Sequence, residues 1–166
     1  MAGLSVRPAR ILIAALSGVL AVLVGTGAWI AAEARDEQGR AGDRRAALEA
    51  AGAHATNLMS LDYRTVDADM GRILDTSTGA ARAEYVANAG RLKTTTVDNK
   101  VVQTGVLRAT ALATMTATVA RVLVVGDVEI RWDGSDSPPQ ERYYRWQMDL
   151  AKSGARWLVS KVVQVP

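Results

Sequence analysis

The chain contains no cysteine, no phenylalanine and only one histidine among its 166 residues. The absence of cysteine excludes a disulfide framework, a thiolate zinc site and a cysteine nucleophile, although it does not identify the cellular compartment. A single imidazole, His54, cannot form a histidine cluster for a metal. Glycine-rich phosphate loops, nucleophile elbows and HExxH motifs are also missing. We therefore predict a protein that is not an enzyme, needs no cofactor or metal, and acts through its shape and contacts.

An excess of charge of one sign is also missing from most of the chain. The formal net charge is +3, but two basic residues, Arg7 and Arg10, precede a long apolar segment. Residues 33–166 carry 18 basic and 17 acidic residues, a net charge of +1. A surface with so little net charge does not favour nucleic acid as a partner.

The most prominent feature of the sequence is a long uncharged run over residues 11–32, ILIAALSGVLAVLVGTGAWIAA. As a helix it would extend about 33 Å, enough to cross a hydrocarbon core of about 30 Å. Arg7 and Arg10 precede the run, so the positive-inside rule places residues 1–10 in the cytoplasm and residues 33–166 outside. We expect a single-pass protein of the cytoplasmic membrane.

Two further features of this segment concern its processing and its packing. Ala32-Glu33-Ala34 has the small-x-small form of a signal-peptide cleavage site, so a cleaved signal is the alternative to a permanent anchor. The run is longer than an ordinary signal-peptide core of about 7–15 residues, which favours the anchor. Ser17, Ala21 and Gly25 lie four apart on one helix face, where small side chains would allow a second helix to approach closely.

Helical periodicity dominates the first half of the outer part. Residues 33–46 are charged and predict a juxtamembrane stalk, followed by an extracytoplasmic domain over residues 47–166. A helix is expected over about 43–61, and residues at helical spacing predict its buried stripe: Ala47, Ala50, His54, Leu58 and Leu61. Thr65 and Thr78 are expected to cap two more helices. The second would span about 79–93, with Tyr85, Ala89 and Leu92 facing inward.

The hydrophobic period then changes from 3.6 residues to 2. Four strands are expected, over residues 97–110, 113–133, 141–151 and 155–165, the last two joined by a short hairpin turn through Ser153-Gly154. Three helices followed by four antiparallel strands predict an α+β domain, in which the helices pack on a curved four-stranded sheet and form a half-open cone.

Three motifs in this order resemble the actinobacterial Mce-associated membrane proteins. They are LMSLDYRTVDAD over 58–69, Thr78-Gly79 followed by Tyr85, and GARWLVS over 154–160. Members of that family are accessory proteins of Mce lipid-import systems. The resemblance covers about residues 10–166, and it implies an outer domain of the nuclear transport factor 2-like cone type, similar to the assembly protein of type IV secretion systems.

Candidate residues for the interior of the cone are one histidine and four aromatic side chains. His54 is either a general base, oriented by Asp62 or Asp67, or a hydrogen-bonded histidine at the margin of the core. An apolar cavity for a lipid tail could be lined by aromatic residues, and ordinary core packing is the alternative. The residues proposed for cavity or contact are His54, Tyr63, Tyr85, Trp132 and Trp146.

A second candidate region is an exposed aromatic and basic strip on the sheet, formed by Arg131, Arg142, Tyr143 and Arg145. Tyrosine and arginine are enriched at protein interfaces, whereas an ordinary solvated strand face is the alternative. We therefore expect a membrane-anchored accessory protein that stabilises or assembles an Mce-type lipid-import complex through its transporter subunits or other membrane proteins. The alternatives are a lipid- or sterol-binding module and an assembly factor of a secretion system.

Overall fold

The computed structural model describes residues 37–166, in which a helix runs over residues 37–59. The apolar run 11–32 lies outside the described residues, as do Ser17, Ala21 and Gly25. No helix within residues 37–166 is both long enough and apolar enough to span a membrane. The chain divides into two compact units at Gly42, and the second, Asp43–Pro166, contains the folded domain described below.

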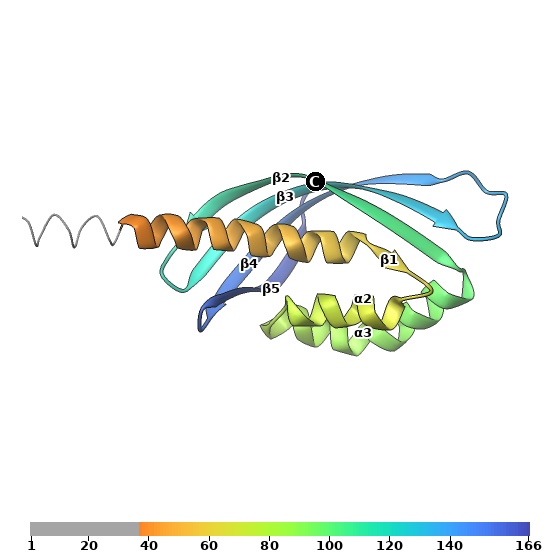
Figure 1. Cartoon of the computed structure of the whole chain (residues 1–166), viewed down its shortest axis with the longest axis horizontal. Coiled ribbons are helices and arrows are strands. Elements are labelled where there is room, and N and C mark those ends of the chain that lie inside the picture. The colour runs from red at the N-terminus through yellow and green to blue at the C-terminus, as the bar shows by residue number, and fades with distance from the viewer. Residues whose placement is uncertain (1–36) are drawn as a thin grey trace, which may run out of the picture. The chain divides into compact units, whose positions relative to one another are not determined.

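The domain is an α+β fold with one antiparallel sheet in the strand order β1-β2-β3-β4-β5 (Figure 1). After the helix that ends at residue 59, the elements are β1 (Leu61–Asp62), α2 (Val66–Asp75), α3 (Gly79–Asp98), β2 (Val101–Met115), β3 (Val119–Trp132), β4 (Gln140–Ser153) and β5 (Arg156–Gln164). The predicted fold class is confirmed, but the sheet has five strands rather than four. The additional strand, β1, consists of only two residues, Leu61 and Asp62, which pair with Gln103 and Val102 of β2.

The predicted boundaries of the first long strand pair were wrong at both ends. Helix α3 continues to Asp98, beyond its predicted end near residue 93, so β2 begins at Val101 rather than at residue 97. The turn between β2 and β3 lies at residues 116–118 rather than near 111–112, and Thr116 closes it by accepting a hydrogen bond from the Val119 amide at 3.1 Å. Ala and Thr recur from Ala109 to Thr118, through the end of β2 and the turn itself, so the pattern did not mark the turn.

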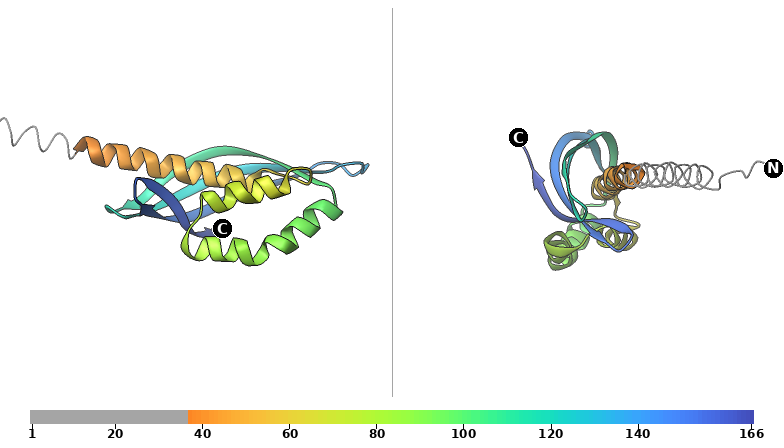
Figure 2. Two further views of the ribbon diagram at one scale, coloured as in Figure 1. Left: turned by 60° about the horizontal axis from the view of Figure 1, so that its bottom comes forward. Right: turned by 90° about the vertical axis from the view of Figure 1, so that its left-hand side faces the viewer.

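The core forms where the helix over residues 37–59 packs inside the curved sheet, as Figure 2 shows. Its buried stripe repeats every four residues and consists of small side chains followed by one long one: Ala47, Ala51, Ala55 and Met59. They pack on the inner-facing residues of β3, β4 and β5, among them Val122, Met148 and Val159. Of the predicted stripe, Ala47 and His54 are buried, whereas Ala50 and Leu58 are only half-buried and the neighbouring Ala51 and Met59 take the core positions. Leu61 is buried too, but in β1 rather than in the helix.

Two glycines give Met59 its place on the sheet. A Cβ atom on Gly105 of β2 would lie 2.2 Å from Met59 Cβ, and one on Gly126 of β3 would lie 2.4 Å from Met59 Sδ. Both strands therefore have bare backbone where the end of the helix approaches. Glycine at close approaches of this kind is expected, since any side chain would push the elements apart.

The motif over 58–69 forms the start of α2 around a buried carboxylate. Asp69, which is 2% exposed, accepts hydrogen bonds from the Asp62 amide at 2.8 Å, the Thr65 hydroxyl at 3.2 Å and Arg72 Nη2 at 2.5 Å. Thr65 occupies the predicted N-cap position, but its side chain makes no capping bond to the helix backbone. These internal contacts hold together β1 and the first turn of α2.

Candidate functional site

A pocket of about 400 Å³ opens between α2, α3 and the inner face of the sheet. Its lining is mainly apolar, with contributions from Leu58, Leu61, Met70, Ile73, Leu92 and Val162. The predicted inward face of the third helix, formed by Tyr85, Ala89 and Leu92, does pack on the buried residues of α2. A pocket of this size and lining has the properties of a small-molecule site.

An aromatic pair forms the sheet side of the pocket. Tyr144 and Trp146 alternate on β4 and stack with ring centroids 4.8 Å apart. Trp146 and Tyr85 both line the pocket, and Tyr85 bonds to His54, so the structure brings together three of the five residues proposed for cavity or contact. Trp146 also belongs to the buried core, so its two predicted roles coincide.

Tyr63 and Trp132 are not part of this pocket. The Tyr63 hydroxyl donates to Asp133 Oδ2 at 2.6 Å, and this hydrogen bond raises the pKa of Tyr63. Trp132 lies beside Asp133 at the end of β3, where it lines a shallow surface depression next to the 133–139 loop. Sequence spacing could not separate these two residues from the other three, since the pocket is formed by elements that are distant in sequence.

His54 is completely buried and uses both ring nitrogens. Nδ1 lies 2.8 Å from Thr76 Oγ1, and Nε2 lies 3.1 Å from the Tyr85 hydroxyl. The single hydroxyl hydrogen of Thr76 is within reach of two backbone carbonyls, those of Arg72 at 2.9 Å and Ile73 at 3.1 Å. With that hydrogen used, Thr76 Oγ1 accepts from Nδ1–H, and we therefore assign Nε2 as the acceptor of the Tyr85 proton.

Burial sets the charge of this network. It lowers the pKa of His54 to about 4 and raises that of Tyr85 to about 12, with a smaller contribution from Glu84. Both groups are therefore neutral at pH 7. Neither Asp62 nor Asp67 orients the imidazole, because Asp62 binds Arg64 and Asp67 binds Lys93. The arrangement matches the hydrogen-bonded core histidine, and no group of three or more potential metal ligands occurs within residues 37–166.

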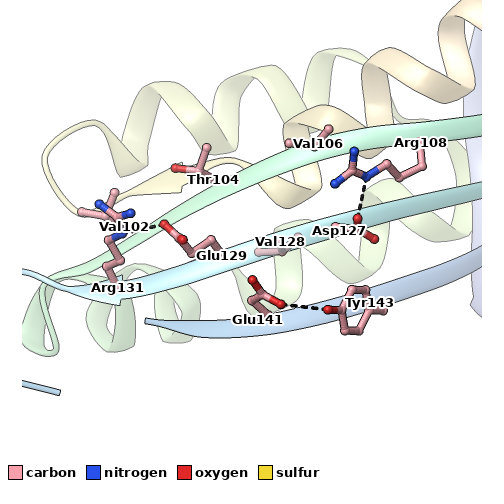
Figure 3. Close-up of a pocket in the computed structure, with 10 residues that line it drawn as sticks. All are labelled: Val102, Thr104, Val106, Arg108, Asp127, Val128, Glu129, Arg131, Glu141 and Tyr143. Atoms are coloured by element: carbon pink, nitrogen blue, oxygen red, sulfur yellow. Dashed lines mark hydrogen bonds and ion pairs between the residues drawn. The ribbon is translucent and has the colours of Figure 1, made fainter. Parts of the chain in front are cut away.

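A second hollow, of about 620 Å³, lies on the outer face of the sheet across β2, β3 and β4 (Figure 3). We call it the outer groove. Its polar side chains interact in pairs. Arg108 of β2 contacts Asp127 of β3 at 2.5 Å, while Arg131 with Glu129 at 2.6 Å and Tyr143 with Glu141 at 2.8 Å pair within one strand each. The groove therefore carries three carboxylates and two guanidinium groups.

The predicted basic strip is only partly present. Arg131 and Tyr143 line the outer groove, and Arg145 is on the same face because it pairs with Val125. Arg142 pairs with Val128, whose side chain is buried, so it points to the opposite face. The acidic partners were missed, although the alternation of Asp127, Glu129 and Arg131 along one strand was the signal that could have placed them together.

Large apolar side chains are exposed on this outer face as well. Val106, Leu123 and Val125 are 47%, 42% and 38% exposed, and Tyr143 is 68% exposed. Strand register places Leu123 and Val125 on the same side as Asp127. Solvated strands usually carry polar residues there, so an apolar strip beside paired charges has the composition of a contact surface.

Comparison with solved structures identifies the fold. The periplasmic domain of DotI is 14% identical with a TM-score of 0.59, over 72% of this chain and 92% of that domain. An IcmL-like type IV secretion system protein from Legionella pneumophila is 13% identical with a TM-score of 0.58, over 72% and 89%. A protein described as a putative aromatic ring hydroxylase from Novosphingobium aromaticivorans is 15% identical with a TM-score of 0.56, over 75% and 91%. Identities this low establish the shared fold alone.

Sequence comparison identifies the family. The protein Rv1363c of Mycobacterium tuberculosis is 30% identical over 171 residues, which cover 98% of this chain and 63% of the relative. The chain thus spans less than two thirds of that relative's length. The family described as "Uncharacterized protein Rv1363c/MT1408-like" matches residues 8–166, and the chain belongs to it.

Proposed function

We propose that the protein is a non-enzymatic accessory subunit, anchored by the run 11–32, whose outer domain stabilises or assembles a membrane protein complex. The observation that carries this proposal is the outer face of the sheet, where exposed apolar side chains adjoin paired charges. From the sequence resemblance, the proposed complex is an Mce-type lipid importer, and its transporter subunits are the proposed partners.

The structural neighbours support an extracytoplasmic assembly role. The DotI fragment is described as a periplasmic domain, and the Legionella protein as part of a type IV secretion system. These descriptions belong to those proteins, and the fold also occurs in the protein described as a hydroxylase, so fold analogy alone does not decide the function. Assembly of a secretion complex is the corresponding alternative for this chain.

The state of His54 supports a role outside catalysis. A general base acts best with a pKa near the working pH, whereas burial holds the pKa of His54 at about 4. Its two nitrogens are also occupied by Thr76 and Tyr85. The only histidine of the chain is therefore a stabilising element of the fold in this proposal.

The charges of the outer groove predict the chemistry of the partner. Glu129 and Glu141 stand directly opposite each other on β3 and β4, which is unfavourable for like charges. A basic side chain from a partner would relieve this repulsion, while Tyr143 and Leu123 would supply apolar contact area. A stable interface needs about 800 Å² from each partner, so the whole outer face would take part.

In-cell photo-crosslinking of the full-length protein tests the proposal. A photoreactive residue at Tyr143 or Leu123 should trap Mce-type transporter subunits. The same residue at Val86, an apolar position on α3 that is 57% exposed, serves as the matched control and should trap far less. Deleting the gene should lower the amount of transporter. An intact, fully active transporter in the deletion strain, or equal crosslinking from Val86, would refute the proposal, and trapped secretion-system subunits would favour the alternative.

A second candidate function is the binding of a lipid or sterol in the inner pocket. Its volume and apolar lining support this candidate, and the stacked Tyr144–Trp146 pair offers a flat surface for an apolar body. Native mass spectrometry of the full chain released from membranes provides the test. A bound molecule of lipid mass, lost when Leu92→Trp fills the pocket, is the expected result, and an empty wild-type protein would contradict it.

A further inference from the structure

We infer that α3 pairs with α3 of a second copy of this chain, in an antiparallel arrangement centred between Ala87 and Gly90. The residues that form the pairing surface line neither the inner pocket nor the outer groove. Self-association through α3 therefore goes beyond the proposed function, with which it shares only the membrane anchor.

Helix α3 carries uncharged residues on two opposite faces, and only one of these faces is covered within residues 37–166. Tyr85, Ala89 and Leu92 pack on the buried residues of α2. The opposite face is formed by six exposed residues that recur every third or fourth position: Ala80, Ala83, Ala87, Gly90, Thr94 and Val97. We call these six residues the outer seam. A helix at a protein surface normally exposes charged and polar side chains on this side, so the outer seam is typical of a helix that packs on a second element.

The spacing and the size of the side chains in the outer seam favour another helix as that element. Intervals of three and four residues alternate along the seam, which is the a and d pattern of a coiled coil. Most of the side chains are alanine or glycine, and a Cβ atom on Gly90 would have nothing within 4 Å, so a second helix can approach closely. Val86 beside the seam and Val97 at its end are 57% and 40% exposed, and they would add larger apolar contacts.

The charges beside the outer seam indicate that the second helix is another α3. Glu84 and Arg91 lie on the same flank of the seam, one heptad apart, and neither takes part in a salt bridge within residues 37–166. In an antiparallel pair, residues of the same flank face each other, so Glu84 of each copy would meet Arg91 of the other. In a parallel pair, Glu84 would face Gly79 and Val86, which carry no charge. The charges of α3 are therefore complementary to those of a second, antiparallel α3.

The size of this contact determines where the pair forms. A helix of 20 residues is about 30 Å long, and one face of it buries less surface than a stable interface, which takes about 800 Å² from each partner. The pair is therefore weak between free domains. Two copies held in one membrane meet at a much higher effective concentration, so the pairing is expected in membranes.

Cysteine crosslinking of the full-length protein in membranes tests the pairing, and the wild type gives no background because it has no cysteine. Ala87→Cys lies beside the two-fold axis and should form a disulfide-linked dimer on mild oxidation. Ala80 of the two copies would lie about 25 Å apart, too far for a disulfide, whereas Ala80 of one copy would face Val97 of the other. Ala80→Cys and Val97→Cys should therefore crosslink when they are co-expressed, and neither should crosslink alone. Thr95→Cys, exposed on α3 but turned away from the seam, and Leu123→Cys, on the outer face of the sheet, are the matched controls.

Charge reversal provides an independent test of the orientation. Glu84→Arg or Arg91→Glu alone should lower the dimer yield of Ala87→Cys several-fold, because two attractive ion pairs become two repulsive ones. Both changes together should restore the yield. Both side chains are exposed, and circular dichroism would report that the variants remain folded.

Several outcomes would overturn the pairing. Crosslinking from Thr95→Cys or Leu123→Cys that equals that from Ala87→Cys would show that the copies meet without using the outer seam. Self-crosslinking of Ala80→Cys would overturn the antiparallel arrangement. A photoreactive residue at Val86 should trap a second copy of the chain, and transporter subunits trapped there instead would assign this face of α3 to a different partner.

Discussion

Replacing Gly105 by alanine should destabilise the domain, because the new methyl group has no room. Its Cβ would lie 2.2 Å from Met59 Cβ, and 3.0 Å and 3.1 Å from the backbone oxygen and carbon of the same residue. Two of these three atoms are backbone atoms at the end of the first helix. A change of side-chain rotamer therefore cannot relieve the contact, and the helix must move away from the sheet.

The expected cost exceeds that of ordinary overpacking. Adding a methylene to a well-packed core typically costs about 1–3 kcal/mol. Shifting the helix end would also loosen the contacts of Met59 with the sheet, so we expect about 3 kcal/mol or more. At about 4 °C per kcal/mol for a domain of this size, the midpoint of thermal unfolding should fall by more than about 10 °C.

A second alanine variant provides the control. Gly90 lies in the interior of α3, and a Cβ atom there would have nothing within 4 Å. Gly90→Ala should stabilise the domain by about 1 kcal/mol, through helix propensity alone. Thermal unfolding of full-length variants in the same detergent, followed by near-ultraviolet circular dichroism, measures both effects. A Gly105→Ala protein as stable as the wild type would show that the approach of Met59 to the sheet has been misjudged.

Three further predictions concern buried polar groups. Burial lowers the pKa of His54 from 6.5 to about 4, so between these pH values the unfolded chain binds a proton that the folded chain does not. The free energy of unfolding should therefore fall by about 3 kcal/mol as the pH drops from 6.5 to 4. A His54→Gln variant that kept the same pH dependence would count against this. Nitrogen-15 NMR of the wild type at pH 7 should report a proton on Nδ1, and a proton on Nε2 would contradict the hydrogen-bond roles assigned to Thr76 and Tyr85. Asp69→Ala should cost about 2–4 kcal/mol in chemical denaturation, because the Asp62 amide loses its partner. Asp67→Ala, at a carboxylate that is 78% exposed, should cost under about 1 kcal/mol, and equal losses would contradict the role of Asp69.

Local signals in the sequence predicted individual elements better than their contacts. The inward face of α3, the N-cap position of Thr65 and the hairpin through Gly154 all follow from residue types within a few positions of one another. The turn between β2 and β3 was misplaced because Ala and Thr recur from Ala109 through Thr118 without Gly, Pro, Asn or Asp to mark the turn. The two-residue β1 was missed because its existence depends on Gln103 and Val102, some forty residues away.

The candidate sites illustrate the same limit. His54 was identified from its position on a helix face, yet its partners Thr76 and Tyr85 are 22 and 31 residues away in sequence. Neither is one of the two carboxylates, Asp62 and Asp67, that the sequence analysis had proposed to orient the imidazole. The outer strip was recognised from Tyr143 and its neighbouring arginines. Strand register shows that Arg142 points to the inner face of the sheet, and that carboxylates lie beside Arg131 and Tyr143 on the outer face.

The sequence alone determined the class of the domain, the near-neutral charge of residues 33–166 and the absence of thiol chemistry, because composition and hydrophobic period are properties of the chain itself. It also indicated an accessory role through the family resemblance. The tertiary structure decided which face of each strand is covered, that His54 is neutral and bonded through both ring nitrogens, and which residues line the inner pocket. These properties depend on pairings between residues distant in sequence, and such pairings exist only after the sheet has curved around the helix.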